Sequence, residues 1–167
     1  MTTADPARRR LWWATWGLPI TWVANDLEEA LTFSPSHAGV TRAMAESPLP
    51  EPLRGKLLEI YGPLIPQRYV TGIVVMGLVM LLAGWIGWRS GGRNPFYLIA
   101  VLGYFLHGFL HFGQALALRT YTPGVITGAL VVVPFGWWVW RWLRREVRLP
   151  LATQARYAVA GVVLVAP

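Results

Sequence analysis

The segment Thr21–Thr32, with the sequence TWVANDLEEALT, places three acidic residues at the end of an apolar, tryptophan-rich run. These acids are Asp26, Glu28 and Glu29. An ionisable side chain inside an apolar environment is costly, and membrane segments that retain one usually need it for function. We therefore expect the rest of the chain to be arranged around these acids.

The composition is that of an integral membrane protein. Of the 167 residues, 54% are hydrophobic, 10 are tryptophan and only 14% are charged, whereas about 25% are charged in typical soluble domains. Three nearly uncharged segments, 69–88, 94–118 and 121–140, each contain the roughly 20 residues that a helix needs to cross about 30 Å of hydrocarbon. The lipid bilayer is therefore an expected partner of this chain.

The pattern predicts an all-α fold, a polytopic membrane bundle of four to five transmembrane helices that forms a single domain over residues 1–167. The helices are expected at about 11–33, 67–88, 95–118 and 122–142, with a short fifth helix at 150–167 as an open alternative. Residues 34–66 contain six prolines and are expected to form an extramembrane loop between the first two helices. Within that loop, leucines at helical spacing predict a short interfacial helix over residues 51–61, which could cover a site at that surface.

Positive charges indicate the orientation of the bundle. Arginines gather at the N-terminus, in the turn at 89–93 and at the end of the fourth helix. Because cytoplasmic loops of membrane proteins are rich in Lys and Arg, we expect a cytoplasmic N-terminus and a location in the cell inner (plasma) membrane. These flanking arginines account for the net charge of +7, so no nucleic-acid partner is expected.

The third predicted helix carries a second polar stripe. Tyr104, His107, His111 and Gln114 are separated by three, four and three residues, so they share one face of a helix. Unsatisfied polar groups in hydrocarbon cost several kcal/mol, and this face should therefore point into the bundle. At about 1.5 Å per residue from the flanking arginines, His111 and Glu28 both lie roughly 27 Å along their helices.

The matching depth of the two stripes predicts a polar pocket in the outer half of the bundle. Its expected catalytic residues are Glu28, Glu29, His107 and His111. The fourth helix should add its N-terminus, with Thr122 as the cap and Pro123 as the first helical residue, because free N–H groups there attract a carboxylate. The side chains expected to bind a substrate are Trp22, Asn25, Tyr104, Gln114, Arg119, Tyr121 and Thr122.

These residues resemble the HXXEE family of small bacterial integral membrane proteins, which is named after a His-x-x-Glu-Glu motif. The resemblance rests on the run NDLEEAL from Asn25 to Leu31, on His111 and on the turn RTYTPG from Arg119 to Gly124, and it covers roughly residues 18–141. The acidic pair of the motif falls on Glu28 and Glu29, whereas Asn25 stands at the position of the motif histidine. The resemblance implies an architecture and a site and leaves the activity open.

The favoured prediction is an enzyme of the isomerase or cyclase type that acts on a lipophilic substrate by acid–base chemistry without a cofactor. Lipids, terpenoids and other intermediates of natural-product biosynthesis are the expected substrate class. Burial favours the protonated form of a carboxyl group, so Glu28 or Glu29 is expected to act as the acid, with His107 or His111 as the base. Asp26 is expected to lie away from this face, as a helix-end or loop contact.

Two alternatives remain open. The first is a metal-dependent hydrolase or oxidase, in which zinc or non-haem iron would be bound by His107, His111, Glu28 and Glu29. The chain has no cysteine, which excludes thiolate ligands, and Asn25 is a poor ligand for these metals. The second is a non-catalytic protein that binds or transports a hydrophobic ligand, although no internal repeat typical of transporters is visible. A homo-oligomer is compatible with either.

Overall fold

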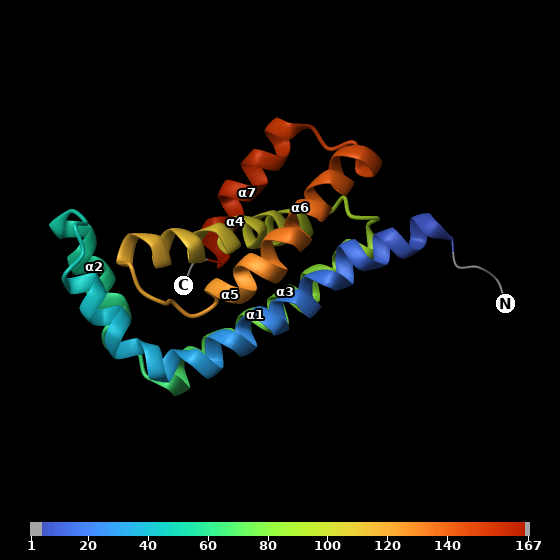
Figure 1. Cartoon of the computed structure of the whole chain (residues 1–167). Coiled ribbons are helices and arrows are strands. Elements are labelled where there is room, and N and C mark those ends of the chain that lie inside the picture. Colours follow the sequence, from blue (N-terminus) through green and yellow to red (C-terminus); the bar gives the residue numbers. More distant parts are fainter. Residues whose placement is uncertain (1–4, 166–167) are drawn as a thin grey trace.

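The computed structural model of the protein describes residues 5–165, with side chains described up to residue 162, and it is all-α as predicted (Figure 1). In chain order the elements are α1 (Pro6–Ala45), α2 (Glu51–Tyr61), α3 (Pro66–Arg89), α4 (Pro95–Leu118), α5 (Val125–Thr127), η1 (Gly128–Val132), α6 (Val133–Trp142), η2 (Leu143–Val147) and α7 (Leu151–Val165). The segments from α5 to η2 form one continuous helical rod, in which η1 and η2 are π-helical turns.

Three helices are long and apolar enough to cross a membrane: Pro66–Arg89, Pro95–Leu118 and Val125–Val147. They correspond to the predicted helices at 67–88, 95–118 and 122–142, and the membrane character of the chain is confirmed for these three. Within residues 5–165, α1 is too polar and α7, with 15 residues, is too short to meet the same criterion. The predicted total of four to five spans is therefore not confirmed. Residues 166–167 of the predicted fifth helix lie outside the described residues.

The first helix is longer than the sequence predicts. The sequence places its end near residue 33 and a loop over 34–66, but α1 continues through Pro35 to Ala45. Pro35 removes one backbone donor, and the hydroxyl of Ser36 donates to the carbonyl oxygen of Thr32 at 2.6 Å, which keeps that turn hydrogen-bonded. Figure 1 shows the second half of α1 turning away from the first. The polypeptide is therefore bent at the predicted boundary and remains helical.

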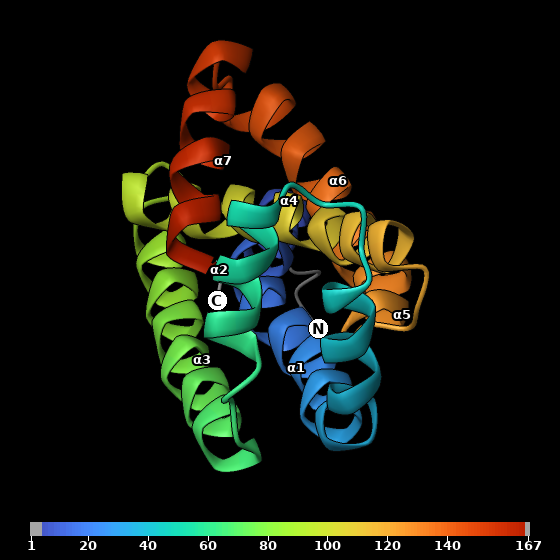
Figure 2. The same cartoon turned by 90° about the vertical axis from the view of Figure 1, so that its left-hand side faces the viewer.

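The helix predicted at 51–61 is confirmed as α2, which lies in front of the gap between α3 and the end of α1 (Figure 2). Aromatic side chains attach it to the bundle. The ring of Tyr61 stacks on His37 with centroids 5.0 Å apart, and a ring nitrogen of His37 lies 3.1 Å from the carbonyl oxygen of Tyr61. Phe33 in turn stacks on Tyr69 at 4.1 Å. This aromatic cluster holds α2 over the end of the bundle.

Close helix packing positions α1 against its neighbours. A Cβ atom on Gly84 would lie 2.9 Å from the carbonyl oxygen of Thr15, so only glycine allows α3 to approach α1 this closely. The hydroxyl of the fully buried Tyr97 donates to the carbonyl oxygen of Ala14 at 2.7 Å, which ties α4 to the same part of α1. The face of α1 that carries the acids is thereby fixed between α3 and α4.

The last helix packs on α4 through two glycines. A Cβ atom on Gly103 would lie 2.6 Å from the carbonyl oxygen of Gly161 and closer still to its backbone carbons. Backbone cannot rotate away as a flexible side chain can, so a methyl group at this crossing forces the helices apart. Further along α4, a Cβ atom on Gly113 would meet no described atom within 4 Å, because that side of the helix faces outward.

The substitution Gly103→Ala should lower the free energy of unfolding in detergent by about 1–3 kcal/mol, because the new methyl group overpacks the crossing of α4 and α7. The matched control is Gly113→Ala on the same helix. It should leave stability unchanged or raise it by up to about 1 kcal/mol through better helix propensity. Thermal unfolding of both variants checks this, and equal stabilities would contradict the observed packing.

Candidate functional site

The site is built on one buried stripe of α1. Trp22, Asp26, Glu29 and Phe33 are separated by four, three and four residues, and each is at most 8% exposed. The prediction that Asp26 lies away from the polar face is wrong, since this residue is only 4% exposed. The physical reason is its spacing, because a residue four positions after Trp22 and three before Glu29 must share their side of the helix.

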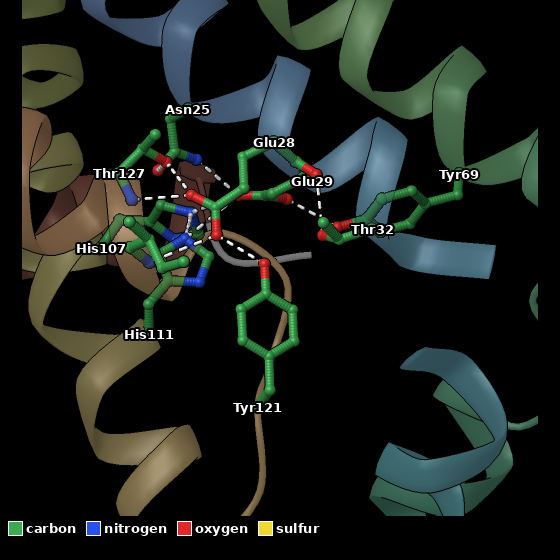
Figure 3. Close-up of polar contacts among 10 residues, drawn as sticks. Asn25, Glu28, Glu29, Thr32, Tyr69, His107, His111, Tyr121 and Thr127 are labelled. Carbon is green, nitrogen blue, oxygen red and sulfur yellow. Dashed lines mark hydrogen bonds and ion pairs between the residues drawn. The ribbon is translucent and has the colours of Figure 1, made fainter. Parts of the chain in front are cut away.

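Glu29 lies at the centre of the polar contacts (Figure 3). Its Oε1 accepts a hydrogen bond from the side-chain amide of Asn25 and lies 3.1 Å from Nε2 of His111 and 4.0 Å from Nε2 of His107. Its Oε2 accepts a hydrogen bond of 2.6 Å from the hydroxyl of Tyr69 on α3. The structure therefore joins the predicted polar stripes of the first and third helices at one carboxyl group.

The two histidines also contact each other. Nε2 of His107 lies 3.0 Å from Nε2 of His111, and both rings are buried on consecutive turns of α4. At this separation one nitrogen donates and the other accepts, and each ring can take either role through its tautomer. Both Nδ1 atoms are buried and lack a hydrogen-bond partner in the described part of the chain. A proton held by this pair can therefore reside on either ring, next to the Glu29 carboxyl group.

Glu28 points to another neighbour. Its carboxyl group accepts hydrogen bonds from the hydroxyl of Tyr121 at 2.6 Å, the backbone N–H of Thr127 at 2.7 Å, the hydroxyl of Thr127 at 2.6 Å and the backbone N–H of Ile126 at 3.3 Å. This is the predicted contact between a carboxylate and the N-terminus of the fourth helix. Glu28 thus caps that helix from outside and lies apart from the histidine pair.

The predicted start of the fourth helix at Thr122 and Pro123 is wrong. The helix begins at Val125, and Gly124 precedes it with a φ of 81° and no side-chain cap. Glycine adopts this left-handed conformation without strain. It also leaves room for the site, because a Cβ atom on Gly124 would lie 2.6 Å from Cε1 of His111 and 2.7 Å from Oε1 of Glu29. The cap is supplied instead by Glu28, from a different helix.

A cavity of about 300 Å³ opens beside the Glu29–histidine contacts. Its lining comes from α1, α2, α3, α4 and the turn before α5, namely Glu29, Val40, Met44, Leu57, Ile60, Tyr61, Leu64, Tyr69, His107, Leu110, His111, Gln114, Leu118, Thr122 and Pro123. Most of these side chains are apolar, and α2 contributes part of the wall. The carboxyl, hydroxyl and imidazole groups thus lie in the wall of a mainly hydrophobic chamber.

Two hydroxyl groups at this chamber lack partners within the described residues. They belong to Thr122, which is 3% exposed, and to Tyr61 on α2. Burial, followed by the nearby negative charge of Glu29, raises the pKa of Tyr61 to about 12, so this side chain remains a neutral phenol. Both hydroxyls are therefore available to a polar group of a bound molecule.

The other predicted binding residues occupy different positions. Trp22 stacks on His107 with centroids 6.4 Å apart and packs against the buried Tyr104. Gln114 lines the cavity from the exposed end of α4. Arg119 does not line it: this exposed residue ends α4 in a left-handed conformation with a φ of 49°. Tyr121 contacts Glu28 and is also absent from the cavity wall.

Sequence reasoning missed Tyr69, Thr127 and Tyr61 as site residues. Tyr69 lies on a helix for which the sequence suggests no functional role, yet its hydroxyl donates to Glu29. The available signal was that Tyr69 is the one tyrosine of α3 and lies in its first turn. Thr127 bonds both Glu28 and the side chain of Asn25, and nothing in its local sequence distinguishes it. These partners lie 40 to 102 positions away in the chain, so spacing within one helix does not reveal them.

The donor set also has the composition of a metal site. Glu29, His107 and His111 each offer one ligand atom, and the three atoms lie within 4.8 Å of one another. Two histidines and one carboxylate suit zinc or non-haem iron. However, metal-bound histidines usually donate their second N–H to a neighbouring acceptor, and both Nδ1 atoms here lack one in the described residues. Glu28, the fourth predicted ligand, is engaged elsewhere.

The fold and site define a helical membrane protein with a buried glutamate–histidine centre beside a cavity that α2 partly walls. The family model described as "Protein of unknown function with HXXEE motif" matches residues 16–139, and the chain belongs to this HXXEE family. No curated protein and no solved structure gives a significant match. The resemblance seen in the sequence is therefore confirmed. Asn25, at the position of the motif histidine, donates to Glu29 and accepts a hydrogen bond from Thr127.

Removing the Glu28 carboxyl group, which caps the fourth helix, should destabilise the protein. We expect Glu28→Ala to lower the free energy of unfolding by about 1–2 kcal/mol, because the N–H groups of Ile126 and Thr127 lose their acceptor. Glu28→Gln should cost less, since its amide oxygen still accepts. Glu59→Ala, on the exposed face of α2, is the control and should be neutral. Thermal unfolding measures all three, and a neutral Glu28→Ala would show that the cap does not stabilise the fold.

Proposed function

We propose that this protein is a membrane-embedded enzyme that isomerises or cyclises a lipophilic small molecule by acid–base chemistry at Glu29, His107 and His111. The observation that supports this most directly is the 3.1 Å contact between Glu29 and His111 at the wall of a mainly apolar cavity. A carboxyl group paired with imidazole is the usual arrangement for moving protons near neutral pH. The surrounding apolar wall keeps water from a reactive intermediate.

The hydrogen bonds suggest how the roles are divided. Glu29 accepts from Asn25 and Tyr69, which stabilises its carboxylate form and leaves it to orient His111. The histidine pair then takes up or delivers the proton, because its two Nε2 atoms lie within hydrogen-bond distance of each other. This differs from the sequence-based expectation of a protonated glutamate as the acid. In this proposal the transferred proton is carried by the imidazole rings of His107 and His111.

The shape and lining of the chamber support a lipophilic substrate. Its volume of about 300 Å³ lies at the lower end of the range of roughly 300–1,000 Å³ found for small-molecule sites. Aliphatic side chains of α1, α2 and α4 would contact a hydrocarbon skeleton, and the hydroxyls of Tyr61 and Thr122 would meet a single polar group. Lipids, terpenoids and related natural-product intermediates have this combination of features.

We also propose that α1 is a fourth membrane-spanning helix and that the N-terminus is cytoplasmic in a bacterial inner membrane. The 40 residues of α1 are more than long enough to span a bilayer, and its acids are buried against α3 and α4 rather than facing lipid. The C-terminal end of η2 and the turn between α3 and α4 share the arginine-rich side with the start of α1 (Figure 1). The positive-inside tendency would place that side in the cytoplasm.

Expression in a bacterial host followed by mass spectrometry of the lipophilic extract tests the proposed activity. Wild-type protein should produce a compound of unchanged mass and altered retention time, because an isomerisation or cyclisation conserves composition. Glu29→Gln and His111→Asn should each reduce this product by about 10²-fold or more, through loss of the acid–base pair. Glu59→Gln on α2 is the control and should retain activity.

Two results would contradict this activity. Identical extracts from wild-type protein and from a folded Glu29→Gln variant would show that the glutamate–histidine pair has no catalytic role. A lipophilic molecule that copurifies unchanged with both proteins would instead favour the role of a hydrophobic-ligand carrier. Thermal unfolding of each variant establishes that it is folded.

A metal-dependent reaction is the second candidate, and the convergence of three ligand atoms within 4.8 Å favours it. Bound zinc or iron would be held by Glu29, His107 and His111 and would supply a Lewis acid. Elemental analysis of protein purified in detergent separates the two candidates. One zinc or iron per chain that disappears in His107→Ala would support the metal, whereas the acid–base scheme predicts less than stoichiometric metal in wild-type protein and no change in that variant.

A further inference from the structure

The three acids of the NDLEE run have three different environments. Glu28 accepts four hydrogen bonds at the start of the fourth helical rod, and Glu29 accepts from Asn25 and Tyr69 beside the histidines. Asp26 differs from both, because its Oδ2 is buried and has no hydrogen-bond partner in the described residues. Only 4% of this residue is exposed. Two of the acids are thus surrounded by donors, and the third is not.

A carboxylate with one buried oxygen that lacks a donor would cost several kcal/mol, and the neutral carboxylic acid costs much less. The charge of Glu29 adds to this preference. Glu29 lies one turn along the same face of α1, and its negative charge disfavours a second one. The ionisable groups that line the same cavity from other helices are Tyr69 and the exposed Arg68 on α3 and His107 on α4. None of these three donates a hydrogen bond to Oδ2 of Asp26.

Asp26 lines a second cavity of about 300 Å³ between α1 and α3. Its wall includes Trp22, Ile73 and Met76, and it shares Ile60, Leu64, Glu29, Tyr69 and His107 with the first cavity. The shared polar residues therefore stand between the two chambers, with Asp26 on one side and His111 on the other. A molecule in the second chamber would contact a carboxyl group, an imidazole and aromatic rings together.

We propose that Asp26 is the proton donor of this site and that the substrate is a lipophilic alkene whose double bond reaches from the first cavity into the second, past the residues that line both. This inference rests on the proposed acid–base function and adds the acid that starts the reaction. The substrate class follows from the lining: a mainly apolar chamber selects a hydrocarbon-like ligand, and the π bond of an alkene is the basic group that such a ligand offers to a neutral acid.

The reaction balances without any co-reactant. The O–H proton of Asp26 is transferred to one carbon of the double bond, and the positive charge develops on the other carbon, where the faces of Trp22 and Tyr69 stabilise it. His107 then removes a proton from the neighbouring carbon, and that electron pair forms the new double bond. The product is an isomer of the substrate. The proton carried by His107 returns to the Asp26 carboxylate, which restores the site.

The test needs no knowledge of the natural substrate. Dicyclohexylcarbodiimide is a lipophilic reagent that reacts with neutral carboxylic acids: the acid proton goes to a nitrogen of the reagent, the carboxyl oxygen bonds to its central carbon, and rearrangement leaves a stable acylurea. We expect full-length protein in phosphatidylcholine vesicles to be labelled at Asp26 at neutral pH, as located by peptide mass spectrometry. Labelling should be lost completely in Asp26→Asn and retained in Glu29→Gln and in the control Glu59→Gln.

Labelling of Glu28 or Glu29 in place of Asp26, or no labelling of folded wild-type protein, would overturn the inference.

A second measurement concerns the reaction itself: Asp26→Asn should reduce the isomeric product in cell extracts by about 10²-fold, as expected for loss of a general acid. The failures of the two proposals are distinguishable. Loss of the product in Glu29→Gln without carbodiimide labelling of Asp26 would keep the proposed function and remove Asp26 from it. Labelling of Asp26 without any product would show a neutral carboxyl group there, but it would remove the proposed function and with it the role of Asp26 as proton donor.

Discussion

The hydrogen bonds between Glu28 and the N-terminus of the fourth helical rod hold the site together. They connect α1 to a segment almost one hundred residues away, and they supply the cap that the turn Thr122–Gly124 lacks. With the rod docked in this way, Gly124 comes to lie directly against Glu29 and His111. Adjacent residues on a helix point about 100° apart. Glu28 can therefore form hydrogen bonds to the fourth rod while Glu29 faces the cavity.

The same segment shows how local surroundings give chemically identical groups different properties. Glu28 meets helix N–H groups and hydroxyls, Glu29 meets an amide, a phenol and two imidazoles, and Asp26 has a buried oxygen with no partner among the described residues. Donors stabilise a carboxylate, and an apolar environment stabilises the neutral acid. Asn25 contributes to this division, because its amide bridges Glu29 and Thr127 at the position where the family motif has a histidine.

Much of the fold was predictable because long apolar segments and helical spacing are local properties of a chain. The helices at 67–88 and 95–118 were placed within about one residue of their observed ends, and His107 and His111 share a face as their spacing requires. The end of the first helix was not predictable, because the one proline at its expected boundary bends the helix without ending it when tertiary contacts continue beyond it. Val40 and Met44, which follow Pro35, are buried against the rest of the bundle.

The sequence by itself determined a helical membrane protein and the two polar stripes that carry Glu29, His107 and His111, because the period of the α-helix alone sets which residues share a face. Only the tertiary structure decided which partner each acid meets. Glu28 was expected to join the catalytic group and Asp26 to lie outside it, yet Glu28 caps the fourth rod and Asp26 is buried against α3 and α4. The physical reason is that hydrogen-bond partners such as Tyr69 and Thr127 come from distant helices, whose relative rotation depends on packing throughout the bundle.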